Sequence, residues 1–329
     1  MKWDLIYNSS MQAIWLQNKK LSYRTDVKIP IPSNDEALVK VLLAGICATD
    51  LQLIQGYYPY SGILGHEFVG EIIQADDAPE RIGERVVGEI NIACDKCASC
   101  LRNHPTHCEH RDVLGIINHN GAFAEYLCLP LKNLITVPDC ISNEVAVFTE
   151  PLAAALQIQQ QIAIHPNDKV LIVGAGRLGQ LIAQTLVLTS CDLQIVARYQ
   201  QQQQLLNNNK IAWLLEQDVE QHSFDIVIEA TGSTTGFNLA IQAVRPRGII
   251  VLKSTYKDMS ANFSSIVVNE ITMVGSRCGS FAPALRLLAN KLVNPNVLIT
   301  NKFPLSQALQ AFEYMQQPGV LKVLLQMDN

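Results

Sequence analysis

The chain has 329 residues, which exceeds the size at which one hydrophobic core keeps growing, so we expect two domains. Hydrophobic residues make up 48% of the sequence and charged residues 17%, which is enough apolar material to fill both cores. The formal net charge of −5 provides no basic surface for nucleic acid or for an anionic membrane, so we expect a small-molecule ligand.

The beginning of the chain has neither the continuous apolar stretch nor the small-residue cleavage site of a signal peptide. No window reaches the roughly 18 consecutive apolar residues that span a bilayer. We therefore expect a soluble, cytoplasmic protein. Its nine cysteines are too few for a disulfide scaffold and are clustered, which indicates metal ligation.

Residues 11–137 have the pattern of short strands. Apolar runs alternate with polar residues between Met11 and Ala44, with a turn at residues 30–35, and further short apolar runs follow between residues 62 and 137. Gly, Pro, Asp or Asn closes each run. This pattern predicts a mostly β first domain.

The period of the pattern changes after Pro151. A helical stretch leads into a buried strand, a glycine turn and a helix at residues 169–189, and further apolar strands follow with helical stretches between most of them. Such alternation predicts an α/β domain with a parallel, doubly wound sheet. The glutamine- and asparagine-rich residues 199–209 are interpreted as a solvated helix start and loop. From about Gly279, two helices and two strands end the chain, and their pattern fits either domain.

The segment 94–108 contains four cysteines at a spacing typical of a metal site: Cys94, Cys97, Cys100 and Cys108. Two-residue gaps let successive thiolates converge on one ion, and four thiolates form a closed tetrahedral zinc site that stiffens a loop. The competing interpretation is an iron–sulfur cluster, but the ferredoxin run continues differently, and here Glu109 follows the last cysteine. Four ordinary buried cysteines are disfavoured because the segment is polar and cannot bury itself. The histidines of this loop are interpreted as solvated: His104, His107 and His110.

A second set of candidate ligands is spread along the chain. Cys47 follows a predicted strand, His66 follows a glycine turn, and Glu67 is adjacent. One thiolate, one imidazole and one carboxylate leave room for water or substrate, as a catalytic zinc requires. Glu150, much further along, is another carboxylate able to hold the metal. Taken singly, such a cysteine is more often a buried core thiol.

Gly174, Gly176 and Gly179 form a G-x-G-x-x-G pattern between a predicted strand and a predicted helix, in a turn that also contains Leu178. In this context the pattern indicates a dinucleotide site, because the glycines let a pyrophosphate approach the backbone and the helix N-terminus. Two nearby cations are interpreted either as pyrophosphate contacts or as surface charges: Arg177 and Arg277.

The end of the next predicted strand bears on the choice of nicotinamide cofactor. An acid there would accept a hydrogen bond from the ribose 2′-hydroxyl and repel a 2′-phosphate. The sequence has Ala197, Arg198 and Tyr199 instead, which leave space and a bidentate cation for a phosphate. We therefore favour NADP(H). The alternative is that Arg198 is solvated and stacks on adenine, which would allow NAD(H).

These motifs follow one another in the order GICATD, GHEFVGEI, the four-cysteine loop, TEPLAAAL and VLIVGAGRLG. In this order and at these separations, the chain resembles the zinc-dependent medium-chain alcohol dehydrogenase/reductase family from about Ala13 to Leu325. The similarity is greatest to the polyol and threonine dehydrogenase branch. The resemblance implies a GroES-like, zinc-bearing catalytic domain at residues 1–154 and 279–329 and a Rossmann cofactor domain at residues 155–278.

The resemblance also implies roles for single residues around a catalytic zinc. Cys47 and His66 would be firm ligands. Glu67 and Glu150 would be ligands that alternate with water. Asp50 would orient the zinc-bound imidazole, which such a carboxylate does by fixing the histidine tautomer.

Thr49 matches the hydroxyl that accepts the proton of the substrate alcohol in this family, and Thr231 with Gly232 matches the turn that passes the nicotinamide ribose. Gln52 departs from the pattern, because many relatives have a proton-relaying histidine there and glutamine does not titrate near neutral pH. We expect further residues to approach the substrate: Leu51, Gln52, Tyr57, Tyr58 and Phe123.

The sequence thus predicts an NAD(P)-dependent alcohol dehydrogenase with one catalytic and one structural zinc per chain. Hydride would pass between NADP(H), the favoured cofactor, and a primary or secondary alcohol or its aldehyde or ketone. One alternative is a zinc-independent quinone reductase of the same superfamily. Another, from a different class, is a zinc-stabilised nucleotide-binding sensor without turnover. Relatives are commonly dimers or tetramers, so the resemblance implies a homodimer or homotetramer.

Overall fold

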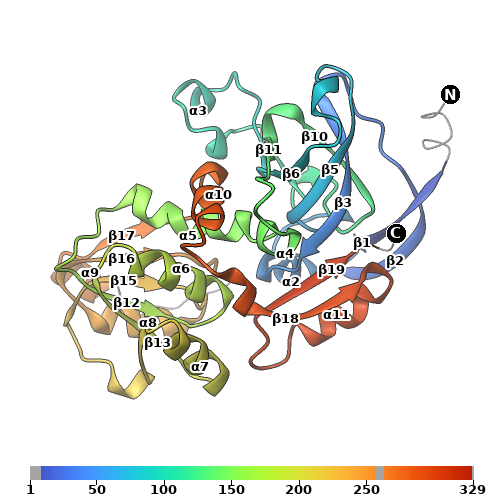
Figure 1. Cartoon of the computed structure of the whole chain (residues 1–329). Coiled ribbons are helices and arrows are strands. Elements are labelled where there is room, and N and C mark those ends of the chain that lie inside the picture. Colours follow the sequence, from blue (N-terminus) through green and yellow to red (C-terminus); the bar gives the residue numbers. More distant parts are fainter. Residues whose placement is uncertain (1–8, 257–262, 328–329) are drawn as a thin grey trace. The chain divides into compact units, whose positions relative to one another are not determined.

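The computed structural model describes residues 9–256 and 263–327 (Figure 1). The chain divides into two compact units. The first is formed by Met1–Glu150 together with Phe281–Asn329, and the second by Pro151–Ser280. Helix α5, Thr149–Gln161, contains the point at which the first unit ends and the second begins.

The first unit is organised around strand β3, Glu36–Gly45. It belongs to a seven-stranded, mostly antiparallel sheet with the strand order β11-β6-β5-β3-β19-β18, and β10 pairs with another part of β3. The other strands of this sheet are β5 (Glu67–Ala75), β6 (Arg85–Gly88), β10 (Tyr126–Pro130), β11 (Leu134–Thr136), β18 (Ile299–Pro304) and β19 (Lys322–Gln326).

Two three-stranded sheets complete the β structure of this unit, with the orders β2-β1-β4 and β7-β8-β9. Their strands are β1 (Ser10–Gln17), β2 (Lys20–Lys28), β4 (Gly62–Ile63), β7 (Asn91–Ile92), β8 (Asp112–Leu114) and β9 (Asn118–His119). The helices of this unit are short: α2 (Ala48–Ile54), α3 (Ala98–Leu101), α4 (Asn143–Ala146), α10 (Phe281–Ala289) and α11 (Ala308–Tyr314).

The end of the chain belongs to the first unit. Strand β19 pairs with β3 so that Leu324 faces Gly45, and β18 runs parallel to β19 at the edge of the same sheet. The sequence pattern alone left this segment open between the two domains. The pairing of β19 with β3 attaches the segment to the first unit.

The second unit is a six-stranded sheet with the order β14-β13-β12-β15-β16-β17, in which every neighbouring pair is parallel (Figure 1). Its strands are β12 (Lys169–Val173), β13 (Asp192–Val196), β14 (Ala212–Leu214), β15 (Phe224–Glu229), β16 (Val244–Leu252) and β17 (Thr272–Gly275). The connecting helices are α6 (Arg177–Val187), α7 (Gln200–Asn208), α8 (Thr234–Ala243) and α9 (Ser264–Val268).

Burial explains why the central strands of this sheet are apolar throughout. Helices on both sides of a parallel sheet bury its two faces, so strand residues do not alternate with polar ones. Val170, Leu171 and Ile172 of β12 are fully buried in succession. Each such side chain contributes about 1.5–3 kcal/mol relative to an exposed position. The predicted α/β class, with one unit built on a doubly wound parallel sheet and the other mostly β, is confirmed.

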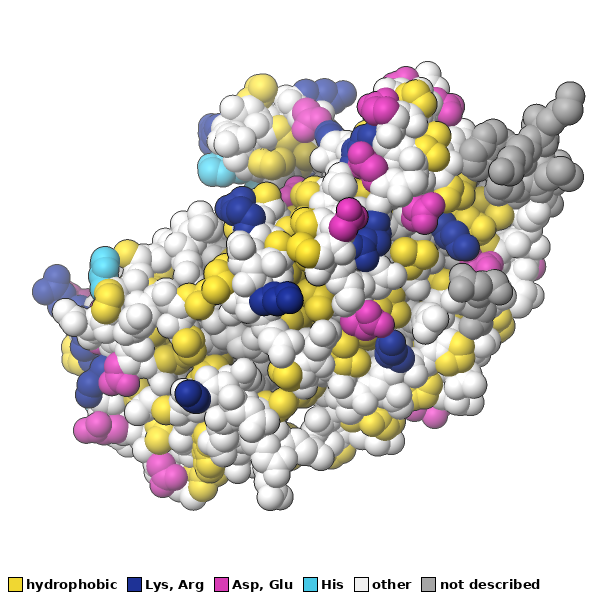
Figure 2. All heavy atoms as spheres, viewed as in Figure 1, with side chains coloured by type: hydrophobic (Ala, Val, Ile, Leu, Met, Phe, Trp, Pro, Cys, Tyr) yellow, Lys and Arg dark blue, Asp and Glu magenta, His cyan; other side chains and the backbone are white. Residues whose placement is uncertain are grey.

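The surface carries charges of both signs. On the face shown in Figure 2, the Lys and Arg side chains of the described residues are interspersed with Asp and Glu and do not gather into one basic patch. None of the helices in residues 9–256 and 263–327 has the length and apolar character needed to cross a lipid bilayer.

Candidate metal and cofactor sites

Strand pairing brings three candidate ligands together in the first unit. Cys47 caps the N-terminus of α2 just after β3, and His66 and Glu67 lie at the start of β5. Because Gly45 of β3 pairs with Glu67, the ends of these segments are adjacent. One ligand atom from each of Cys47, His66 and Glu67 lies within 4.8 Å of the other two.

A glycine turn aims the imidazole of His66. Gly65 has φ +99°, a backbone conformation that is strained for any residue other than glycine. A Cβ at this position would lie 2.5 Å from the ring of Phe123, so the turn also packs closely. Phe123 is fully buried and meets Phe312 edge-on, with ring centroids 5.8 Å apart.

Asp50 lies behind the imidazole and is fully buried. One carboxylate oxygen accepts a 2.8 Å hydrogen bond from the backbone N–H of Cys47, and the other lies 3.4 Å from Nδ1 of His66. Burial alone would lower the pKa of His66, but the negative charges of Asp50 and Cys47 outweigh it and raise the pKa well above its usual value.

This arrangement suits a metal-binding histidine. Nδ1 of His66 and the facing oxygen of Asp50 are buried and have no hydrogen-bond partner at ordinary distance in the described structure. A carboxylate so placed fixes which ring nitrogen carries the proton and leaves the other for a metal. The donor set of thiolate, imidazole and carboxylate therefore fits zinc.

Three further predicted residues, Thr49, Gln52 and Glu150, are half-buried in the first unit. Thr49 is half-buried in the first turn of α2. Its hydroxyl oxygen accepts a 3.7 Å hydrogen bond from the thiol of Cys47. Gln52 is half-buried on the same helix. Glu150, half-buried in the first turn of α5, is not a member of the 4.8 Å group, so its ligation stays a prediction.

Lys322 is a functional candidate that sequence reasoning missed. Its ammonium group forms an ion pair with Glu67, donates a 3.2 Å hydrogen bond to the carbonyl of Ile46, and lies 5.6 Å from the ring centroid of Phe148. Lys322 and Glu67 are both 1% exposed. The carboxylate of Glu67 thus lies close to the other two candidate metal ligands and also pairs with a buried ammonium group.

The ion pair crosses the strand that separates its two partners. Lys322 starts β19 and Glu67 starts β5, and β3 lies between these strands. A Cβ on Gly45 of β3 would lie 2.7 Å from Glu67 Oε2 and 2.7 Å from Lys322 Cε. The absence of a side chain at Gly45 therefore leaves the space in which the pair forms. A lysine at the start of an apolar strand was the only sequence signal.

The four-cysteine loop converges within a short segment. Its sulfur atoms lie at hydrogen-bonding distances from one another, at 3.4 Å for Cys97 and Cys100, 3.4 Å for Cys94 and Cys108, and 3.7 Å for Cys97 and Cys108. All four fall within 4.8 Å of one another. The backbone N–H groups of Cys94 and His110 donate to the buried sulfur of Cys108.

Backbone donors favour thiolate at part of this loop. Hydrogen bonds from the backbone of Cys100 and Glu109 lower the pKa of Cys97 to about 6, whereas desolvation raises the pKa of Cys100 to about 12. Four sulfur atoms within 4.8 Å of one another fit a closed zinc site. The three histidines of the loop are exposed and do not belong to the sulfur group.

The glycine turn of the second unit closes tightly between β12 and α6. Gly174 has φ +110°, and a Cβ there would lie 2.7 Å from the methyl group of Thr231. A Cβ at Gly179 would lie 1.9 Å from the carbonyl oxygen of Gly174, so only glycine lets the helix approach the turn. Gly176 caps α6 and has open space around its Cα, which suits the approach of a pyrophosphate.

A buried carboxylate holds the turn that contains Thr231 and Gly232. Glu229, fully buried at the end of β15, accepts hydrogen bonds from the backbone N–H groups of Thr231 at 2.7 Å and Gly232 at 3.2 Å. It also accepts from the hydroxyls of Thr231 and Tyr256. Burial and the charge of Glu229 raise the pKa of Tyr256. Sequence reasoning did not single out Glu229.

The residues expected to select the cofactor follow β13. Ala197 is buried, whereas Arg198 and Tyr199 are exposed. The guanidinium of Arg198 lies 3.3 Å from a carboxylate oxygen of Glu216, which sequence reasoning also missed. Arg277 is exposed, and its backbone carbonyl accepts a 2.6 Å hydrogen bond from the buried Lys253.

Two family models match most of the chain. Residues 33–139 match the family described as "Alcohol dehydrogenase GroES-like domain" and residues 143–327 match "Glucose dehydrogenase C-terminus", the second match alone spanning more than half of the chain. The chain belongs to the zinc-type medium-chain dehydrogenase family. This dehydrogenase is therefore an oxidoreductase of the alcohol dehydrogenase type, and the family predicted from the motifs is confirmed.

Three relatives illustrate the similarity. The dehydrogenase is 28% identical to sorbitol dehydrogenase of Halalkalibacterium halodurans over 319 residues, which cover 90% of this chain and 93% of the relative. A chain described as a zinc-binding dehydrogenase from Sinorhizobium meliloti 1021, bound to NADP, matches with a TM-score of 0.89 at 26% identity, covering 97% of this chain and 100% of its own. A chain from Escherichia coli CFT073 described as a short chain alcohol dehydrogenase, complexed with NADH, matches with a TM-score of 0.87 at 27% identity and the same coverage.

Proposed function

We propose that this dehydrogenase is zinc-dependent and transfers hydride between a nicotinamide cofactor, with NADP(H) favoured, and a small alcohol or its carbonyl counterpart. The observation that carries the proposal is the convergence of Cys47, His66 and Glu67 within 4.8 Å, with the buried carboxylate of Asp50 behind the imidazole. When bound there, zinc would supply Lewis-acid polarisation of the substrate oxygen, and the nicotinamide would give or accept the hydride.

The protein's own side chains would hold the metal and handle the proton. Cys47 and His66 are the proposed permanent ligands, and Glu67 and Glu150 the exchangeable ones. The Thr49 hydroxyl, which contacts the thiol of Cys47, is the proposed acceptor of the alcohol proton. Because the amide of Gln52 does not titrate near neutral pH, the proton would leave by water or by a cofactor hydroxyl.

The second unit is the proposed cofactor domain, at residues 155–278, with residues 1–154 and 279–329 as the catalytic domain. The G-x-G-x-x-G turn would bind the pyrophosphate, assisted by Arg177 and Arg277, and the turn at Thr231 and Gly232 would bind the nicotinamide ribose. Arg198 after the buried Ala197 supports NADP(H). Among the relatives, one is described with NADP and another with NADH.

A polyol is the proposed class of substrate. Relatives similar over 90% or more of this chain are named sorbitol dehydrogenase, L-galactonate-5-dehydrogenase and D-arabinitol dehydrogenase. The half-buried Gln52 and the exposed Tyr57 and Tyr58 offer the polar groups that several hydroxyls would need.

The four-cysteine loop is proposed to hold a second, structural zinc. Four sulfur ligands leave no coordination position for a substrate, so this ion would stabilise the loop 94–108 and take no part in the chemistry. A homodimer or homotetramer is the proposed assembly, which light scattering coupled to gel filtration measures directly.

The decisive experiment combines a metal count with a substrate panel. We expect two zinc ions per chain and oxidation of at least one polyol or secondary alcohol, with faster turnover using NADP than NAD. The Cys47→Ser variant should lose turnover while still binding the cofactor. Cofactor binding without oxidation of any diol, sugar alcohol or secondary alcohol would contradict the proposal and favour a sensor.

A further inference from the structure

The acid that would favour NAD(H) after β13 is absent there, but one lies after the adjacent strand. Val196, the last residue of β13, pairs with Leu214, the last residue of β14. Two residues beyond each lie Arg198 and Glu216. The parallel register therefore sets the cation and the acid opposite each other at the carboxyl edge of the sheet, where dinucleotide folds bind the adenosine ribose.

The two side chains contact each other. A terminal nitrogen of Arg198 lies 3.3 Å from Oε2 of Glu216, and their side chains are 69% and 50% exposed. Ion pairs this exposed are worth only about 0–1 kcal/mol, so a ligand can separate the partners easily. The contact joins two exposed side chains and involves no buried group.

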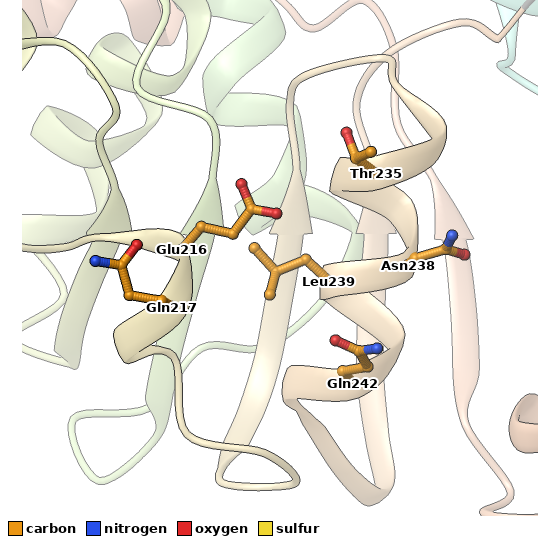
Figure 3. A pocket seen from close by; sticks show the side chains of 6 residues that line it. All are labelled: Glu216, Gln217, Thr235, Asn238, Leu239 and Gln242. Atoms are coloured by element: carbon orange, nitrogen blue, oxygen red, sulfur yellow. The ribbon is translucent and has the colours of Figure 1, made fainter.

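Glu216 also borders an open groove, so its carboxylate is accessible from that side. The groove has a volume of about 530 Å³ and lies between the turn at residues 216–217 and helix α8. In Figure 3 the carboxylate of Glu216 extends toward Leu239 of α8, with Thr235 nearer the N-terminus of the same helix. Glu216 is the one ionisable side chain among the residues that line this groove, and most of the others are polar but uncharged.

Arg198 and Glu216 have opposite preferences for the group on the ribose 2′ carbon. A guanidinium binds a 2′-phosphate bidentately, and a carboxylate repels it. A carboxylate accepts hydrogen bonds from a 2′-hydroxyl, which gives a guanidinium no anion to bind. A site that contains both can therefore serve either cofactor, with a preference smaller than Arg198 alone would give.

We propose that Glu216 is a specificity-determining residue that supplies the ribose-binding acid from β14 and opposes Arg198, so that the enzyme accepts both NAD(H) and NADP(H). The inference rests on the proposed function, because it assumes that a nicotinamide dinucleotide binds at the glycine turn. It adds a residue and a dual cofactor range to that proposal.

Direct binding of NADPH and NADH, followed by nucleotide fluorescence at low salt, tests the inference without knowledge of the substrate. In Glu216→Gln the Kd for NADPH should fall about two- to fivefold, the range expected for one exposed charge contact, while the Kd for NADH rises. Glu220→Gln is the matched control, because it removes the same charge from an exposed position outside the groove lining. It should leave the ratio of the two Kd values unchanged.

The opposite signs distinguish specificity from structural damage. Misfolding around residue 216 would weaken the binding of both cofactors together, and Arg198→Ala should weaken the binding of NADPH while sparing that of NADH. Unchanged Kd values in Glu216→Gln, or a shift of both in one direction, would overturn the role of Glu216 while leaving the proposed function intact. A wild-type enzyme that binds neither dinucleotide would overturn both.

Discussion

The four-cysteine loop and the group of Cys47, His66 and Glu67 offer a metal comparable donors but are built in different ways. The loop gathers its ligands from fifteen consecutive positions, 94–108, with backbone N–H groups pointing at sulfur. The other group depends on the pairing of β3 with β5 and on buried charges around it, Asp50 behind His66 and Lys322 behind Glu67. A local site tolerates changes elsewhere in the sheet, whereas a site assembled from distant segments depends on them.

Replacing one ligand in each site separates the two roles and gives the largest expected effect. In Cys47→Ser, kcat/KM should fall by at least about a thousandfold, because the metal's several kcal/mol of transition-state stabilisation is lost. In Cys108→Ser, the folded enzyme should keep most of its turnover and melt at a lower temperature, since only the loop loses its ion. Metal analysis, turnover and thermal melting measure these differences.

The exposed Cys140 supplies the control for both variants. Cys140→Ser should keep the full metal content and the full activity, because this thiol belongs neither to the four-cysteine group nor to the group of Cys47, His66 and Glu67. Equal losses of turnover in Cys47→Ser and Cys108→Ser would remove the distinction between a catalytic and a structural ion.

Breaking the buried ion pair tests whether the distant site depends on the sheet. Lys322→Met leaves the carboxylate of Glu67 buried without its countercharge, which should destabilise the first unit by about 3–5 kcal/mol. The double variant Glu67→Gln with Lys322→Met should recover much of this stability, because neither member of the pair then leaves an unpaired buried charge. Urea unfolding measures both.

Lys302→Met is the matched control for the lysine variant. Lys302 forms an ion pair with Glu144, but the two side chains are 43% and 36% exposed, so its loss should cost at most about 1 kcal/mol. If the two lysine variants unfolded at the same urea concentration, the buried pair would carry no special weight and the contrast between the two sites would weaken.

Neutralising Asp50 should have a smaller effect, confined to the metal. In Asp50→Asn the amide oxygen can still accept the backbone N–H of Cys47, while the charge facing His66 disappears. Loss of such a partner typically costs about 10–100-fold in metal affinity. Chelator competition should show this loss for one ion per chain and leave the four-cysteine loop unaffected. Equal weakening of both ions would contradict it.

The sequence predicts the local site better than the assembled one for a physical reason. The spacing of Cys94, Cys97 and Cys100 predicts a metal loop without knowledge of the fold, and the strand, glycine turn and helix around Gly174 likewise predict a dinucleotide turn. Lys322 and Glu67 are 255 positions apart, and only the pairing of β19 and β5 with β3 brings them together. No periodicity within either strand encodes that contact.

The same reasoning applies to the cofactor edge and to the end of the chain. The sequence indicates a cation at Arg198, but the acid at Glu216 faces it only through the parallel register of β13 with β14. The apolar pattern after Gly279 fits either unit, and the pairing of Leu324 with Gly45 decides. Within the sequence, only the family resemblance, and not the apolar pattern, favours one of the two units.

Gly45 provides the finest test of how the assembled site is held. Gly45→Ala places a methyl group 2.7 Å from both Glu67 Oε2 and Lys322 Cε, so the pair must shift or separate. We expect a loss of stability of about 1–3 kcal/mol, as for other overpacked positions, and weaker retention of one zinc. Gly275→Ala is the control, because Gly275 also lies in a strand but a methyl group there would meet no atom within 4 Å. If Gly45→Ala behaved like Gly275→Ala in urea unfolding and in chelator competition, the position of Glu67 would not depend on the space left by the missing side chain at Gly45.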